Sequence, residues 1–177
     1  GKTARVEEVW QKPPAPYLVS IDDCDSSGKP FCAISTYYEW KEHWTRQQLS
    51  TIAGRFSKDA GTPLEGIIRS IAIEERTSCG RVRTCAIATS SGIYSYVGDK
   101  VRFVLRRAGK DNPILRSAGI TSCVADHQTI TITGRGYGHG VGLCQYGARG
   151  LAEHGHDYRT ILKHYYTGVE VTRLKGW

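Results

Sequence analysis

Methionine is absent from the 177 residues, and the chain begins with Gly1. We therefore expect a processed or trimmed product whose upstream residues are not seen, and no signal peptide is visible. Long apolar runs are also missing, since none approaches the roughly 20 residues that a helix needs to span a bilayer. The sequence therefore predicts no transmembrane segment.

Two common ligand-binding patterns are missing as well. The six cysteines include no Cys-x-x-Cys pair, so we predict disulfides in an oxidising compartment and no metal site in this chain. Cys24 and Cys32 flank a turn-rich loop and make the best local pair, while the full connectivity stays open. Free buried thiols are the alternative for one pair. The glycine-rich segment at residues 134–148 lacks the Gly-x-Gly-x-x-Gly and Gly-Lys-Ser/Thr spacings of nucleotide-binding loops. Nucleotide binding is therefore disfavoured.

The net charge of +7 arises from 24 Lys and Arg against 17 Asp and Glu. Such a balance favours acidic partners, including the anionic bacterial wall, anionic lipid and nucleic acid. The basic residues are scattered along the chain, as expected for an ordinary solvated surface. Polyanion binding would rest on charge alone, and we predict no nucleic-acid partner.

The pattern along the chain predicts an α+β fold, with mainly antiparallel strands and a few short helices in a single compact domain over residues 1–177. Thr45-Arg-Gln-Gln48 resembles a capping box that begins a helix, and Gly54 is expected to end that helix. Asp99 and Asp157 are expected to cap two further helices, and another helix is expected at 143–154. Strands are expected at 33–44, 66–75, 80–89, 93–97, 128–133 and 169–174.

Glycine occupies every second position from Gly134 to Gly142. So many glycines weaken a plain strand, but they suit a backbone that bends or approaches a ligand closely. If the segment is extended, the four intervening side chains share one face, namely Arg135, Tyr137, His139 and Val141. That face would then hold a cation, an aromatic ring and an imidazole in a row.

These side chains suit sugar recognition. A tyrosine ring can stack on a pyranose, an arginine can pair with carboxylate or carbonyl groups, and a histidine can move a proton near neutral pH. A buried, hydrogen-bonded imidazole is the alternative for His139. The predicted substrate-binding residues are Arg135, Tyr137 and His139, with Gln145 and Tyr146 at the start of the following helix.

The segment from Gly134 to Ala148 resembles the signature of the SpoIID/LytB family, which comprises stage II sporulation protein D and the amidase enhancers. Ile161-Leu-Lys-His-Tyr-Tyr-Thr-Gly168 is similar to the C-terminal helix and tyrosine pair of that family. Shorter matches at 9–10, 16–18, 78–82 and 114–117 lie in the expected order. The resemblance thus extends over nearly the whole chain.

The resemblance implies an extracytoplasmic cell-envelope protein, secreted or membrane-anchored, whose partner is the glycan strand of peptidoglycan. The sporulation member is a lytic transglycosylase, which cuts between N-acetylmuramic acid and N-acetylglucosamine and leaves a 1,6-anhydro end. One carboxyl group would donate and then accept the proton. The alternative is a non-catalytic wall-binding module that enhances a cell-wall amidase, so whether this chain is an enzyme stays open.

In that family the catalytic glutamate, and the His and Cys residues linked to zinc, would precede Gly1. We therefore expect this chain to lack both, with its catalytic residue unknown, no cofactor of its own, zinc only in the full-length parent, and the missing N-terminal segment as a partner. Cys144 replaces the family's serine, either to pair with Cys123 or as a reactive thiol. No acid in the chain is favoured as the general acid, and we expect glycan binding with poor cleavage. The acids considered are Glu7, Glu8, Asp22, Asp23, Glu39, Asp126 and Glu153.

Overall fold

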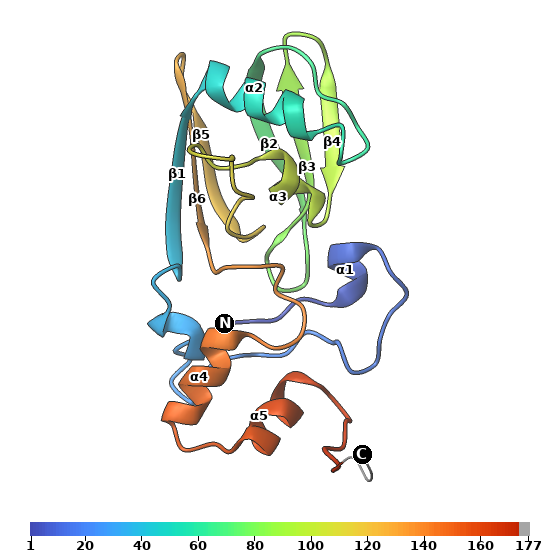
Figure 1. Ribbon diagram of the computed structural model, residues 1–177, viewed down its shortest axis with the longest axis vertical. Helices are drawn as coiled ribbons and strands as arrows, with labels where there is room; N and C mark the ends of the chain where they lie inside the picture. Colours follow the sequence, from blue (N-terminus) through green and yellow to red (C-terminus); the bar gives the residue numbers. More distant parts are fainter. Residues whose placement is uncertain (174–177) are drawn as a thin grey trace.

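The computed structural model describes residues 1–173, and two three-stranded antiparallel sheets form the upper half of the molecule in Figure 1. The first sheet has the strand order β1-β6-β5 and the second has the order β2-β3-β4. The strands are β1 (Glu39–Thr45), β2 (Ile68–Arg76), β3 (Val82–Thr89), β4 (Ile93–Val97), β5 (Ile120–Ala125) and β6 (Thr129–Arg135).

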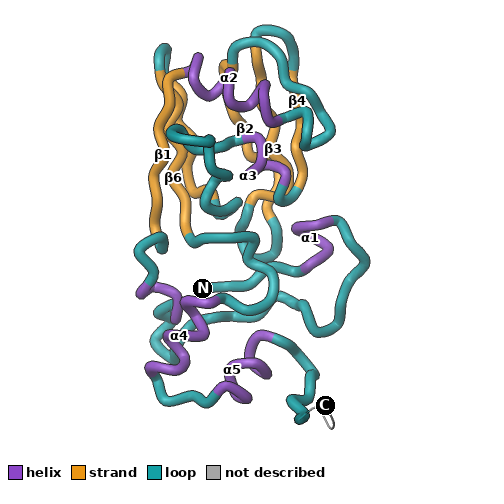
Figure 2. Tube along the Cα trace, in the orientation of Figure 1, coloured by secondary structure: helices purple, strands orange, loops and turns teal. Residues whose placement is uncertain are grey.

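Within residues 1–173, five short α-helices and one 3-10 helix, η1, complete the fold. Helices α2 and α3 lie beside the sheets, whereas α1, α4 and α5 lie below them together with the N-terminus (Figures 1 and 2). No described helix is long and apolar enough to cross a membrane. The predicted α+β fold with antiparallel strands and short helices is confirmed. The helices are α1 (Val6–Trp10), η1 (Phe31–Ile34), α2 (Arg46–Phe56), α3 (Lys100–Val104), α4 (Gln145–Glu153) and α5 (Tyr158–Tyr165).

Residues 39–135, which we call the sheet region, enclose one continuous core. Ile130 and Ile132 of β6 are fully buried and alternate with half-buried threonines, as the two-residue period of a strand requires. Side chains from both sheets, α2 and α3 join them, including the fully buried Trp44 and Leu49. The hydrophobic pattern of the sequence therefore accounts for this half of the molecule.

Residues 1–38 and 136–173, which we call the pocket region, contain two much smaller apolar clusters. One joins Val6 and Val9 of α1 to Val141 of the glycine-rich segment. The other joins Leu151 of α4 to Ile161 and Tyr165 of α5. The N-terminal arm lies along the glycine-rich segment, because the Ala4 amide donates to the Gly140 carbonyl at 2.8 Å.

Several expected helix ends are confirmed. The Thr45 hydroxyl accepts from the Gln48 amide, and the Gln48 side chain accepts from the Thr45 amide, so the capping box begins α2 as predicted. Asp157 caps α5 by accepting from the Thr160 amide at 2.8 Å. Asp99 does precede α3, but its carboxylate makes no capping bond and pairs with Arg102 instead.

Three local predictions are wrong. The strand expected at 33–44 begins only at Glu39, because Phe31–Ile34 form η1 instead. Gly54 does not end α2, which continues to Phe56, because the last turn closes through a hydrogen bond from the Ser57 amide to the Ala53 carbonyl. The strand expected at 169–174 is absent over residues 169–173, which pair with no sheet, and Leu174 lies outside the described residues. The sequence also gave no indication of α1 or β5.

Candidate functional site

The glycine-rich segment leaves the first sheet where β6 ends, at Arg135. The next alternate glycines, at 136, 138, 140 and 142, all have positive φ values between 69° and 86°. Left-handed residues at every second position turn the backbone repeatedly, so the segment is not extended. The prediction that Arg135, Tyr137 and His139 share one strand face is therefore wrong.

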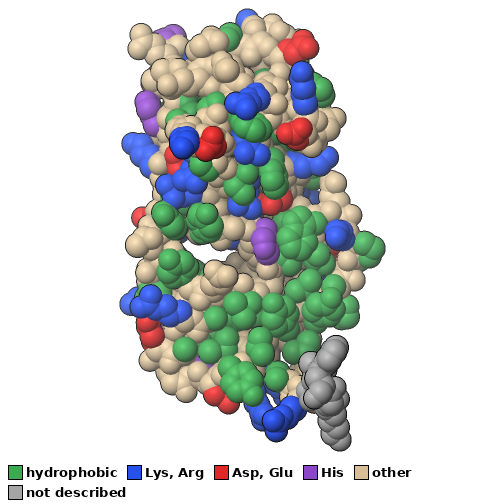
Figure 3. Space-filling view, in the orientation of Figure 1, with side chains coloured by type: hydrophobic (Ala, Val, Ile, Leu, Met, Phe, Trp, Pro, Cys, Tyr) green, Lys and Arg blue, Asp and Glu red, His purple; other side chains and the backbone are tan. Residues whose placement is uncertain are grey.

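This winding segment forms one wall of a pocket of about 310 Å³. The N-terminal arm, the η1 segment and the start of α4 supply the other walls, and the space-filling surface is hollowed between the sheet region and the pocket region (Figure 3). The side chains used below that line the pocket are Asp23, Cys32, Tyr38, Arg81, Tyr137, His139, Cys144, Gln145 and Tyr146.

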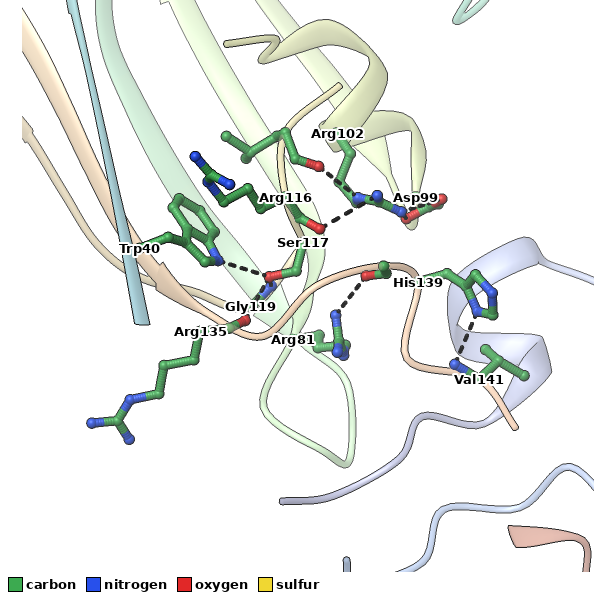
Figure 4. A network of polar contacts seen from close by, with 12 residues as sticks. Trp40, Arg81, Asp99, Arg102, Arg116, Ser117, Gly119, Arg135, His139 and Val141 are labelled. Atoms are coloured by element: carbon green, nitrogen blue, oxygen red, sulfur yellow. Dashed lines mark hydrogen bonds and ion pairs between the residues drawn. The ribbon is translucent and has the colours of Figure 1, made fainter. Parts of the chain in front are cut away.

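Four of the five predicted binding residues line this pocket, namely Tyr137, His139, Gln145 and Tyr146. Arg135 does not line it. Its guanidinium pairs with the Glu39 carboxylate at 3.1 Å and borders a separate, shallow depression on the first sheet. Figure 4 shows the Arg135 and His139 side chains pointing away from each other.

An aromatic pair stands at the edge of the pocket. The Tyr137 side chain is 58% exposed, and its ring lies 5.3 Å from that of Tyr37 with an interplanar angle of 30°. The Arg116 guanidinium lies over the Tyr37 ring, 4.4 Å from its centroid. Cation–π attraction therefore holds the Tyr37 side chain in place. The result is a supported but accessible aromatic surface.

His139 is held in one orientation by two contacts. Its Nδ1 accepts a hydrogen bond from the Val141 amide at 3.1 Å, and its ring lies 4.8 Å from the Trp10 ring. Partial burial lowers the pKa of His139 below its ordinary value of 6.5. The neutral ring therefore carries its proton on Nε2, which can donate to a ligand. Because the residue as a whole is exposed, the alternative of a buried core histidine does not apply.

Arg81 is a pocket residue that sequence reasoning did not select. Its Nη1 donates to the Gly138 carbonyl at 3.2 Å (Figure 4), and the guanidinium forms no ion pair within the described part of the chain. A Cβ at Gly140 would collide with this guanidinium, so glycine is needed there for the close approach. Burial lowers the pKa of Arg81, but a guanidinium stays charged. The pocket therefore contains a cation available to an anionic ligand.

Three potential metal-ligating side chains meet at the inner wall of the pocket. One oxygen of Asp23 and the sulfur atoms of Cys32 and Cys144 lie within 4.8 Å of one another. Cys144 also caps α4, since its Sγ accepts from the Gly147 amide at 3.3 Å. The Cys32 thiol donates a hydrogen bond that lowers the pKa of Cys144, and this contact, together with burial, raises the pKa of Cys32.

All six cysteines, which lie within residues 1–173, are free thiols. The expected disulfides are therefore not formed in the structure. Cys24 Sγ contacts the Gly1 carbonyl at 3.3 Å, whereas Cys32 faces Cys144 across the pocket wall. Cys123 packs against the core of the sheet region and cannot meet Cys144.

The carboxylates considered as general acids are placed differently from one another. The Asp23 side chain is buried and accepts from Tyr165 Oη at 2.8 Å. It is also the single carboxylate that lines the pocket among the described residues. The others are engaged elsewhere: Glu7 with Arg5, Glu8 with Ser78, Asp22 with Lys2, Glu39 with Arg135, Asp126 within its own turn and Glu153 with Arg149.

Comparison with known proteins gives both a family and named relatives. The family described as "Domain of unknown function (DUF8618)" matches residues 31–142. Stage II sporulation protein D of Bacillus amyloliquefaciens is 57% identical over 49 residues, which are 28% of this chain and 14% of that protein. The amidase enhancer of Bacillus subtilis is 53% identical over 47 residues, which are 27% of this chain and 7% of that protein.

Stage II sporulation protein D of Bacillus subtilis is 50% identical over 49 residues, which are 28% of this chain and 14% of that protein. The resemblance to sporulation protein D and the amidase enhancers is therefore confirmed over about 28% of the chain. In each case the match spans only a small part of the relative's length.

Proposed function

The chain belongs to the DUF8618 family, and we propose that it is a cell-envelope domain that binds the glycan strands of peptidoglycan in the pocket beside its glycine-rich segment. The observation that carries this proposal is the convergence of Tyr137, His139 and Arg81 on one pocket. The names of the relatives, sporulation protein D and amidase enhancer, support a role at the cell wall.

Each of these side chains matches a feature of an amino-sugar polymer. The exposed Tyr137 ring offers a flat apolar surface to a pyranose. The Arg81 guanidinium can pair with the lactyl carboxylate of an unsubstituted muramic acid or with a stem-peptide carboxylate. His139 Nε2 can donate to a hydroxyl or acetamido oxygen. Arg81 thereby takes the role that the sequence suggested for Arg135.

A binding titration with soluble, purified glycan fragments tests this proposal. Tyr137→Ala should weaken binding, whereas Tyr158→Ala should not, because Tyr158 is equally exposed at 61% but does not line the pocket. Arg81→Gln should weaken binding more than Arg135→Gln does. Thermal unfolding of each variant checks that the fold is retained. Unchanged affinity in both pocket variants would remove the proposal.

We propose further that this surface serves a lytic transglycosylase, which cuts between N-acetylmuramic acid and N-acetylglucosamine, and that the general acid lies outside this chain. Asp23 is a poor candidate, because it is only 2% exposed and already accepts from Tyr165 and His164. The isolated chain should therefore bind glycan strands and leave them uncut. Mass spectrometry that detects 1,6-anhydro ends after incubation with this chain alone would contradict this.

The amidase-enhancer relative supports a second candidate, in which the same domain presents glycan to a cell-wall amidase. The exposed Tyr37–Tyr137 pair would then contact protein as well as sugar. Adding the chain to an amidase assay on purified sacculi distinguishes the two. Faster release of stem peptides, abolished by Tyr137→Ala and unaffected by Tyr158→Ala, would favour the enhancer role.

A further inference from the structure

The cluster of Asp23, Cys32 and Cys144 is built from separate segments of the chain. Asp23 lies in the loop before η1, Cys32 lies within η1, and Cys144 lies at the N-terminus of α4. Their ligand atoms nevertheless lie within 4.8 Å of one another. Two sulfur donors and one oxygen donor on three independent segments therefore converge on one point of the pocket wall.

The buried carboxylate at this point forms no ion pair with a Lys or Arg of the described residues. Asp23 is 2% exposed, and a buried carboxylate is costly unless it is paired with a cation or coordinates a metal. No Lys or Arg among residues 1–173 pairs with it, and its one potentially cationic partner is His164, whose Nε2 lies 3.3 Å from Oδ1. A cation bound between Asp23 and the two sulfur atoms would pair with the buried carboxylate.

The neighbouring groups are arranged as supports for such ligands. Tyr165 Oη donates to Asp23 Oδ1 at 2.8 Å, which fixes the carboxylate from the α5 side. The Gly147 amide donates to Cys144 Sγ at 3.3 Å, and the positive end of α4 favours a thiolate there. Outer contacts of this kind orient the ligands of protein-bound metals.

From this geometry we propose that Asp23, Cys32 and Cys144 bind one Zn²⁺ ion at the inner wall of the pocket. Two thiolates select a borderline-soft ion such as zinc over magnesium or calcium, and a carboxylate completes a three-residue set. All three residues line the pocket, so the fourth position would be filled from the pocket by water or by a ligand oxygen. This site does not depend on the proposed glycan binding.

Metal binding by the chain itself provides the test, without any glycan present. The reduced chain is loaded with Zn²⁺ under anaerobic conditions, separated from free metal, and its zinc content is measured. We expect one zinc per chain in the wild type and in Cys123→Ser, a matched control in which an equally half-buried thiol outside the cluster is replaced. Loss of a hydrogen bond that only supports a metal ligand typically lowers metal affinity by about 10–100-fold. Cys32→Ser and Cys144→Ser each remove a ligand itself, so each should lower the zinc affinity by more than that.

The absorption spectrum of the chain loaded with Co²⁺ in place of Zn²⁺ identifies the ligands of the metal. The wild type should show thiolate-to-cobalt charge transfer with the visible bands of a tetrahedral site, and Cys32→Ser should roughly halve the charge-transfer intensity because one of two thiolates is lost. Asp23→Asn should keep the charge transfer but bind more weakly. Circular dichroism of each apo variant separates loss of the site from loss of the fold.

Three results of the zinc measurements would overturn the proposal: no zinc retained by the reduced wild type, equal zinc contents in the wild type and in a folded Cys32→Ser or Cys144→Ser variant, or an equal loss in Cys123→Ser. Formation of a Cys32–Cys144 disulfide in place of metal binding, detected as a mass two hydrogens lower that persists under the loading conditions, would also overturn it. None of these results bears on glycan binding, which is measured separately.

Discussion

The two halves of the molecule are stabilised in different ways. The sheet region has one continuous core, to which both sheets, α2 and α3 contribute. The pocket region has two small apolar clusters and four alternate glycines with positive φ, and it supplies every polar side chain that lines the pocket except Arg81, which comes from the sheet region. We therefore expect the sheet region to supply most of the stability, whereas the pocket region, which holds most of the proposed binding residues, should have lower local stability.

The largest effect is expected from a core substitution in the sheet region. Leu49 is completely buried, so Leu49→Ala should lower the free energy of unfolding by about 2–5 kcal/mol. Urea unfolding measures this loss. At temperatures where the variant stays folded, its glycan affinity should equal that of the wild type, and a parallel loss of affinity would show that the two halves are not separable.

A smaller effect is expected from the packing of α4 in the pocket region. A Cβ at Gly150 would collide with the Phe31 carbonyl, and overpacking of this kind typically costs about 1–3 kcal/mol. Gly150→Ala should therefore speed hydrogen exchange in η1 and α4 while leaving β1 and β6 protected. Ala152→Gly, at an exposed position of the same helix, is the control for helix propensity. Faster exchange throughout the sheets would contradict the proposed division.

The Tyr37–Tyr137 pair should affect glycan binding and leave the stability of the fold nearly unchanged. Tyr37→Ala removes the ring that supports Tyr137, and aromatic pairs contribute about 0.5–1.5 kcal/mol. The free energy of glycan binding should become less favourable by about 0.5–1.5 kcal/mol, with little change in the free energy of unfolding. An affinity loss accompanied by an equal loss of stability would assign the pair a structural role instead.

His139 provides a pH-dependent test. Because partial burial lowers its pKa below 6.5 in the folded state, the unfolded chain binds the proton more readily between the two pKa values, and stability falls as the pH falls through that window. An NMR titration should give a pKa below 6.5 for His139. Trp10→Ala should raise that value toward 6.5, because the ring that covers His139 is removed. A pKa unaffected by Trp10→Ala would exclude this contact as the cause.

The smallest effect is expected at Arg135. Its ion pair with Glu39 is solvent-exposed, and exposed pairs contribute roughly 0–1 kcal/mol. Arg135→Ala should therefore change the unfolding midpoint only slightly, and the effect should shrink further in high salt. A loss of more than about 2 kcal/mol, outside this range, would indicate a role that the contacts do not show.

The same division explains what could be predicted from the sequence. The alternation of Ile130 and Ile132 and the capping box at Thr45 are local patterns, and the structure confirms both. The glycine-rich segment, recognised by its composition, also contains four residues that line the pocket, namely Tyr137, His139, Gln145 and Tyr146. Its path could not be predicted, because alternate glycines allow extended and left-handed backbone equally well.

The rest of the site depends on long-range contacts. Arg81 reaches the pocket from the turn before β3, and Asp23 reaches it from the loop before η1. Neither lies near the glycine-rich segment in sequence, and no local spacing brings them together. The sequence signal for Arg81 was its place in the short match at 78–82, and for Cys32 and Cys144 it was an even cysteine count that suggested disulfides.

The central claim is that the pocket lined by the glycine-rich segment is the glycan-binding site. Backbone chemical shifts recorded during titration with soluble glycan fragments test it most directly. We predict that the chemical-shift changes concentrate at residues 136–146 and at Arg81. The strands β2, β3 and β4 should show no changes. Changes confined to the sheet region, or none at saturating glycan, would contradict the account.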